Sequence, residues 1–302
     1  GARRTTSGRR GPRSGYVQLA YLIEENVSIC FSLDGPADVH DANRGLSRSG
    51  CYEAVASNIE LFRRLWESRH NSPPVLRAMM TTTRASLSQA RRIVETYVGF
   101  GITRIAVRPV TRVGRARSSA AVTYSAEEYL TLWKDVVDTV LELRAGGLDV
   151  REVFLELILK KLFIGESGYM DLRSPCGATI GQIVYHHDGS IYTCDEGRMV
   201  GGDRFRIGRI DEPLARSLLS PTARAVLDAS ATQHYYCDHC AYQPFCGVCP
   251  VLHHADRGAL VVNVLEQDRC ATFGGMIQHV LEKFATDRVA RAEFEAILAS
   301  AE

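Results

Sequence analysis

The sequence is organised around one stretch of thirteen residues, Cys237-Asp-His-Cys240-Ala-Tyr-Gln-Pro-Phe-Cys246-Gly-Val-Cys249. Its four thiols stand at C-x2-C-x5-C-x2-C spacing, and a C-x2-C step lets a tight turn aim two thiolates at the same metal. Further cysteines frame the stretch, namely Cys176, Cys194 and Cys270. Seven of the nine cysteines therefore fall within residues 176–270. This density indicates metal ligation rather than packing.

Composition bounds the class of protein. The chain has 302 residues, of which 45% are hydrophobic and 24% charged, with a net charge of +1, which fits one large or two ordinary domains. No apolar run of 18 residues and no apolar N-terminal segment is present, so we expect neither a membrane span nor a secretory signal. We therefore expect a cytoplasmic protein whose cysteines hold metal rather than disulfides. The balanced charge makes nucleic acid an unlikely partner.

The first part of the chain predicts an α/β fold. Residues 1–15 are rich in Arg, Gly and Ser and predict a disordered basic arm. Residues 16–115 alternate between strand-like and helix-like patterns, with strands expected at 27–35, 75–82 and 102–107, so a parallel sheet is predicted. A helix over about residues 86–98 would bury Ala90, Ile93, Val94 and Tyr97 on one face. Asp34 lies at the end of the first of these strands and Arg108 directly follows the third, where α/β folds place ligands. A structural role is equally compatible with either residue.

The second part changes character. Residues 116–172 predict a linker of two helices. The first starts at a capping box formed by Ser125 and Glu128, and the second, strongly apolar, covers about residues 151–163. Residues 173–275 are loop-rich and contain the cysteines, with a hairpin signal at Asp188-Gly189. Residues 276–302 predict a C-terminal helix.

The cysteine spacing resembles that of the radical SAM/SPASM peptide and protein maturases. Cys176 is followed by twelve residues, Gly189, four residues and Cys194, and Cys270 closes the set. One step departs from the family pattern, because two residues separate Cys246 from Cys249 where the family usually has three. Further resemblance lies in Ser32-Leu-Asp-Gly-Pro36 and in residues 105–115, which are similar to the family's fourth and sixth barrel strands. The strings around the cysteines most resemble the maturase of the His-Xaa-Ser peptide system.

The resemblance, which covers roughly residues 27–275, implies the C-terminal half of a partial (β/α)6 radical SAM barrel followed by a SPASM domain. It also exposes an absence: the family holds its radical-generating cluster on a C-x3-C-x2-C loop, and this sequence contains no such motif. The chain also begins with Gly rather than Met. We therefore expect a fragment or processed form that does not cleave S-adenosylmethionine alone.

The resemblance implies two auxiliary [4Fe–4S] clusters. One would be held by Cys237, Cys240, Cys246 and Cys270. The other would be held by Cys176, Cys194 and Cys249, with one iron open to substrate, water, or a side chain such as His186, His187 or Asp188. Structural zinc is the alternative, since four thiolates also make tetrahedral zinc sites.

Other roles come from the same resemblance. Asp195 is similar to a general base in sulfatase-maturing relatives, although a structural Asp fits as well. Ser32 and Asp34 would lie near the nucleoside of S-adenosylmethionine, and Arg108 near its carboxylate, which suits a guanidinium.

The implied function is modification of a ribosomally made precursor peptide, with a reductant such as flavodoxin or ferredoxin. Two alternatives remain open. One is a non-catalytic module that binds zinc or iron–sulfur and recognises a peptide. The more distant one is a zinc-dependent nucleic-acid binder that uses the basic arm.

Overall fold

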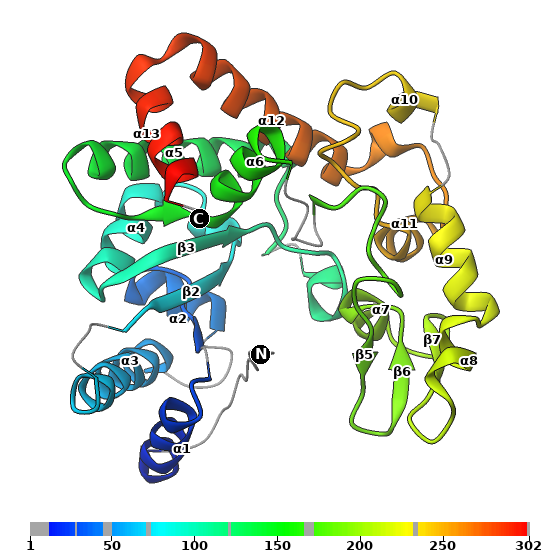
Figure 1. The fold of residues 1–302 in the computed structure, drawn as a ribbon, viewed down its shortest axis with the longest axis horizontal. Helices are drawn as coiled ribbons and strands as arrows, with labels where there is room; N and C mark the ends of the chain where they lie inside the picture. Colours follow the sequence, from blue (N-terminus) through cyan, green and yellow to red (C-terminus); the bar gives the residue numbers. More distant parts are fainter. Residues whose placement is uncertain are drawn as a thin grey trace. The chain divides into compact units, whose positions relative to one another are not determined.

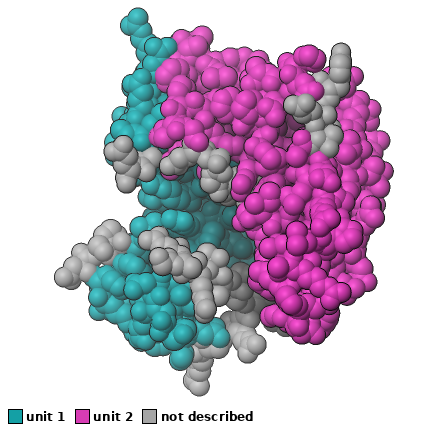
Figure 2. Space-filling view, turned by 45° about the vertical axis from the view of Figure 1, so that its right-hand side comes forward, with its two compact units in different colours: residues 1–109, 131–156, 287–302 teal, residues 110–130, 157–286 magenta. Residues whose placement is uncertain are grey.

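The computed structural model describes residues 12–27, 29–44, 50–70, 74–119, 122–165, 172–231 and 235–300. The chain forms two compact units, coloured separately in Figure 2. Unit 1 comprises residues 1–109, 131–156 and 287–302, and unit 2 comprises residues 110–130 and 157–286. The boundaries cut through the predicted helical linker, because its two helices each run from one unit into the other.

Unit 1 contains a four-stranded parallel sheet (Figure 1). Its strands, in spatial as in chain order, are β1 (Cys30–Ser32), β2 (Leu76–Thr81), β3 (Ile102–Arg108) and β4 (Arg151–Glu152). The helices lying wholly in this unit are α1 (Pro12–Glu24), α2 (Ala37–Arg44), α3 (Cys51–Glu67), α4 (Ala90–Gly99) and α13 (Arg288–Ala299), with a 3-10 turn at Arg84–Ser86. The predicted parallel α/β sheet is therefore confirmed.

The core of unit 1 follows the sequence pattern. On α4 the predicted apolar face is buried, with Ile93, Val94 and Tyr97 at 0% exposure. On β2 the side chains alternate between buried and more exposed along the strand, as expected for period-two alternation. The sheet is thus covered by helices that the 3.6-residue periodicity identifies.

The start of unit 1 differs from the prediction. Helix α1 begins at Pro12, so the predicted disordered arm of residues 1–15 is wrong for its last four residues, and residues 1–11 lie outside the described part. A proline is well placed there because the first helical position needs no N–H donor.

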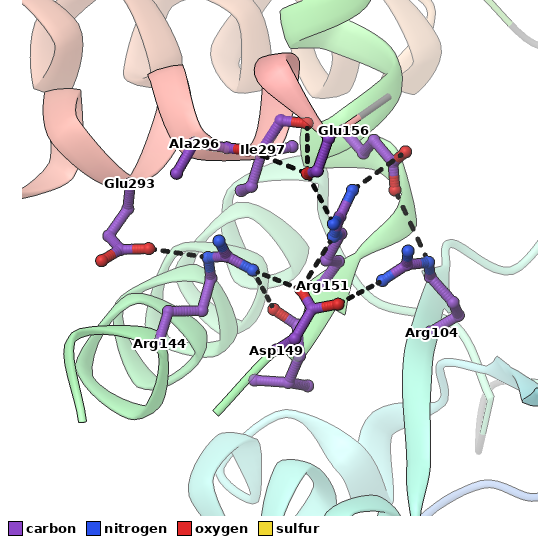
Figure 3. A network of polar contacts seen from close by, with 10 residues as sticks. Arg104, Arg144, Asp149, Arg151, Glu156, Glu293, Ala296 and Ile297 are labelled. Carbon is purple, nitrogen blue, oxygen red and sulfur yellow. Dashed lines mark hydrogen bonds and ion pairs between the residues drawn. The ribbon is translucent and has the colours of Figure 1, made fainter. Parts of the chain in front are cut away.

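Strand β4 is a feature that the sequence pattern missed. We expected residues 151–163 to be one helix, but Arg151 and Glu152 pair with β3 before α6 (Val153–Phe163) begins. Both side chains are charged yet buried, at 4% and 0% exposure. Arg151 is accepted there because two carboxylates face its guanidinium (Figure 3): Nε lies 3.1 Å from Asp149, and Nη1 lies 3.8 Å from Glu156. Ser300 Oγ accepts a further hydrogen bond from it at 2.7 Å.

Unit 2 holds a small antiparallel sheet of β5 (Val184–Tyr185), β6 (Ser190–Tyr192) and β7 (Arg206–Arg209). The first two strands confirm the predicted hairpin, whose turn contains Gly189 at φ +84°. The other elements of unit 2 are α7 (Asp195–Val200), α8 (Leu214–Leu218), α9 (Pro221–Ala231), α10 (Tyr235–Asp238), α11 (Pro250–Arg257), α12 (Asp268–Thr286) and 3-10 turns at Gly114–Ser118 and Val264–Glu266. The loop-rich character predicted for residues 173–275 reflects these short elements.

Capping residues mark where three of the longer helices begin or end. Helix α5 (Ala126–Ala145) starts at the predicted capping box, in which Ser125 N donates to Glu128 Oε2 and Glu128 N donates to Ser125 Oγ. The predicted single C-terminal helix is instead two, because Asp287 ends α12 and caps α13 by accepting hydrogen bonds from two backbone N–H groups. Among the described residues, no helix is both long and apolar enough to cross a membrane.

Candidate metal centre

Short elements of unit 2 place the seven thiols of the cysteine-rich region. Cys194 and Cys249 directly precede helices α7 and α11, and Cys270 lies in the first turn of α12. The others stand in or beside turns: Cys176 before the hairpin, Cys237 in α10, Cys240 just after it, and Cys246 at the end of a turn over residues 241–245. All seven are free thiols.

Three of the thiols share one apolar cluster. Cys194 and Cys249 are buried beside Tyr192 and Phe205, and Cys176 packs against the same cluster. Burial raises the pKa of Cys249 to about 12, and the charge of Cys176 adds to this effect. Burial likewise raises the pKa of Cys194, with a smaller contribution from Cys249. These three thiols therefore lie near one another in a poorly hydrated place.

The surroundings of Cys194 are closely packed. Its Sγ accepts a hydrogen bond of 3.3 Å from the backbone N–H of Gly197, so the thiol caps α7. A Cβ on Gly197 would lie 2.7 Å from Thr193 Oγ1 and 2.9 Å from Phe205 Cβ, so only glycine fits there. The local sequence thus fixes the direction of this thiol.

The remaining four thiols interact with one another. Burial raises the pKa of Cys246 to about 11, opposed by Arg269 and reinforced by Cys270, Cys237 and Cys240. The pKa of Cys237 is raised by burial and then by Cys270 and Cys240, and that of Cys270 by burial and then by Cys240. Cys237, Cys240, Cys246 and Cys270 thus lie close enough for their charges to interact.

The spacing of the thiols bears on what they can hold. Tetrahedral zinc with bonds of about 2.3 Å would keep its sulfurs about 3.8 Å apart. Among the described residues, His40, Asp41 and Cys51 form a group whose ligand atoms all lie within 4.8 Å of one another. No other three His, Cys, Asp or Glu side chains in that part of the chain lie as close together. Neither set contains three thiols that compact, and thiolates are donors that both zinc and iron–sulfur clusters use.

The group in unit 1 does not suit a metal. The backbone N–H of Asp34 donates to His40 Nδ1 at 3.2 Å, which leaves the proton of a neutral imidazole on Nε2. Asp41 Oδ1 accepts from the N–H of Tyr52 at 2.8 Å. The imidazole therefore has no lone pair to offer, and we assign no metal there.

The residues predicted to bind S-adenosylmethionine lie at the carboxyl edge of the parallel sheet. Ser32 is the exposed last residue of β1, Arg108 is the last residue of β3, and Asp34 follows β1. The Asp34 carboxylate is 1% exposed and is held by protein groups: Arg44 donates two hydrogen bonds at 2.6 and 2.8 Å, and Thr81 N donates one at 3.0 Å. Asp34 thus shapes this edge, and Arg44 is a partner that sequence reasoning did not assign.

The predicted catalytic residue Asp195 is the first residue of α7, next to Cys194 in the chain. Its carboxylate is exposed and forms an ion pair of 2.7 Å with Arg198. Of the side chains considered for the open iron, His186 Nδ1 lies 3.1 Å from Asp188 Oδ1 within the hairpin turn, and His187 is exposed. The backbone N–H of Ser190 has the largest effect on the pKa of Asp188 and lowers it, and His186 lowers it further.

Two cations beside the thiols were missed by sequence reasoning. Arg269 lowers the pKa of both Cys246 and Cys249. Lys161, in the last turn of α6, is 7% exposed and donates to the carbonyl of Phe245 at 3.3 Å. The position of Arg269 directly before Cys270 was a usable signal, whereas nothing in the apolar pattern of α6 marked Lys161.

Known proteins resemble this chain in sequence and in fold. No family model matches the chain. Over 231 residues the chain is 20% identical to the cysteine-type anaerobic sulfatase-maturating enzyme of Clostridium perfringens (strain 13 / Type A). The alignment takes in 75% of this chain and 58% of that enzyme, so the chain spans less than two thirds of its relative.

Solved structures show the same fold. The chain matches native anSMEcpe with bound AdoMet at a TM-score of 0.74 and 17% identity, over 92% of this chain and 72% of that one. It matches native anSMEcpe with bound AdoMet and Kp18Cys peptide at 0.72 and 18% identity, over 92% and 73%. The chain thus shares its fold with this AdoMet-bound protein. The resemblance to the His-Xaa-Ser maturase stays a prediction.

Proposed function

We propose that this chain carries the auxiliary iron–sulfur part of a radical S-adenosylmethionine maturase that modifies a ribosomally made peptide. The observation that carries the proposal is the gathering of seven thiols in unit 2 into a set of three and a set of four. The similarity to a sulfatase-maturating enzyme, and to a solved structure that holds AdoMet and a peptide, supports the same proposal.

Each set of thiols has a distinct task in this proposal. When bound, a [4Fe–4S] cluster supplies a one-electron carrier. Cys237, Cys240, Cys246 and Cys270 would complete the coordination of one cluster. Cys176, Cys194 and Cys249 provide one thiolate fewer, so one position of the second cluster would be open to a substrate atom, water or another side chain.

The protein around the thiols contributes water exclusion and orientation. Tyr192 and Phe205 cover the three-thiol set with apolar surface, and the Gly197 N–H fixes Cys194. Asp195 is our candidate for accepting a proton from the substrate, since it follows Cys194 directly and Arg198 holds its carboxylate at the start of α7. At the other unit, Ser32, Asp34 and Arg108 are candidates for the S-adenosylmethionine site.

Paired cysteine variants test the proposal. Cys176→Ala and Cys237→Ala are purified and reconstituted without oxygen, with Cys30→Ala as a control from β1, outside both sets. We expect each of the first two variants to lose a different signal in the electron paramagnetic resonance spectrum of the reduced protein, and Cys30→Ala to keep both. Loss of the same signal in both variants would overturn the assignment of thiols to two sites.

A second function is favoured by one sequence observation, the lack of a C-x3-C-x2-C motif in the 302 residues. A module that recognises a peptide through a metal-stabilised fold needs no such motif. Equilibrium dialysis with S-adenosylmethionine separates the two functions. Intact clusters with no S-adenosylmethionine binding would favour the recognition module over the maturase part.

A further inference from the structure

The step from Cys246 to Cys249 joins the two sets of thiols. Cys246 interacts with the set of four and Cys249 with the set of three, although only two residues separate them. The backbone between them is tightly confined, since a Cβ on Gly247 would lie 1.8 Å from the carbonyl oxygen of Arg173. The shortened C-x2-C step is therefore a fixed connection rather than a loose loop.

Arg269 is anchored on this same step. Its Nε donates to the carbonyl of Gly247 at 3.1 Å, and its guanidinium lies 4.6 Å from the centre of the Phe273 ring. Both partners restrain the side chain, because a guanidinium over an aromatic face is held by cation–π attraction. Because Gly247 lies between Cys246 and Cys249, this anchor holds the guanidinium on the step that links one thiol of each set.

Lys161 occupies a different place. Its ammonium is nearly buried, donates to Phe245 O, and interacts with the charge of Cys246. Burying an ammonium is costly unless an opposite charge lies near. The negative charge of the four-thiolate set supplies one, because Phe245, whose carbonyl accepts from Lys161, directly precedes Cys246 in the chain.

We propose that Arg269 is a positioning residue shared by both cluster sites, and that Lys161 serves the four-thiol site alone, so that the two reduction potentials are set separately. The inference rests on the proposed function, since it requires that both sets of thiols hold clusters. A fixed positive charge stabilises the more negative, reduced state of a nearby cluster and thereby raises its reduction potential.

The test is a redox titration of the full chain, followed by electron paramagnetic resonance, with signals assigned from Cys176→Ala and Cys237→Ala. We expect Arg269→Gln to move both midpoint potentials to more negative values, and Lys161→Met to move only that of the four-thiol cluster. Arg269→Lys keeps the charge and should leave both midpoints close to those of the wild type. Iron and sulfide are measured in every sample.

The outcomes separate this inference from the proposed function. A wild-type chain without iron and sulfide would refute the proposed function itself. Unchanged midpoints in fully loaded Arg269→Gln, or equal shifts of both clusters in Lys161→Met, would overturn only the inference. If Arg269→Gln does not bind clusters, the midpoint potentials of Arg269→Lys provide the test. Midpoints equal to those of the wild type would support the role of the charge, and displaced midpoints would refute it.

Discussion

Replacement of Glu152 by Gln should change how the stability of unit 1 depends on pH. The carboxyl is fully buried on β4, and burial raises its pKa to about 7. Hydrogen-bond donors oppose this shift without cancelling it, among them Leu155 N at 2.7 Å, Trp133 Nε1 at 2.9 Å and Val107 N at 3.3 Å. The folded protein therefore keeps a proton that the unfolded chain loses near pH 4.5.

The sign and size follow from linkage. Between pH 4.5 and 7 the folded state binds more protons at this site than the unfolded state, so stability falls as pH rises. With these two pKa values, ionisation of Glu152 lowers the unfolding free energy by about 2.5 kcal/mol between pH 5 and pH 8. Glu152→Gln has no proton to lose, so its stability relative to the wild type should rise by about that amount over this range.

Tryptophan fluorescence suits the assay, because the chain's two tryptophans, Trp66 and Trp133, both belong to unit 1. Urea unfolding at several pH values gives the free energies, and the difference between variant and wild type is plotted against pH. Glu142→Gln removes an exposed carboxylate from the same unit and serves as the control. A Glu152→Gln difference that stays constant from pH 5 to pH 8 would refute the reasoning.

Two further substitutions probe packing and charge. Gly247→Ala should remove iron from both thiol sets, because the added Cβ would overlap a backbone carbonyl. In the control, Gly274→Ala, the added Cβ meets only an ordinary 3.8 Å contact, so this variant should retain iron. Equal iron content in the two variants would contradict the tight confinement of the backbone between Cys246 and Cys249. Asp34→Asn should destabilise unit 1 by roughly 3 kcal/mol, because it leaves the charge of its arginine partner uncompensated. Asp38→Asn, at an exposed ion pair, should have little effect in the same urea titration, and similar losses in both would show that burial of the pair is unimportant.

Sequence reasoning succeeded where local chemistry decides the structure. The capping box at Ser125, the hairpin around Gly189 and the buried face of α4 each depend on a few neighbouring residues, and each is present. It failed at β4, because two charged residues in an otherwise helical pattern gave no sign that Asp149, Glu156 and the distant Ser300 would satisfy Arg151.

The candidate site shows the same division. The grouping of the thiols into two sets came from the family resemblance and stays a prediction, since spacing alone would have kept Cys246 and Cys249, one C-x2-C step, together. The cations could not be predicted in this way, because Lys161 comes from a helix 76 residues before Cys237 and meets Phe245 only through tertiary packing. Asp34 was identified as a site residue from its place after a strand, but its carboxylate is held by Arg44.

The most direct measurement is the content of iron, zinc and acid-labile sulfide per chain after purification and reconstitution without oxygen. Two [4Fe–4S] clusters require about eight irons with matching sulfide per chain, and that is the result we predict. About one or two zinc ions without sulfide would contradict the account. The seven cysteines would then stabilise a zinc-binding module, and the roles given to Arg269 and Lys161 would fall with the clusters.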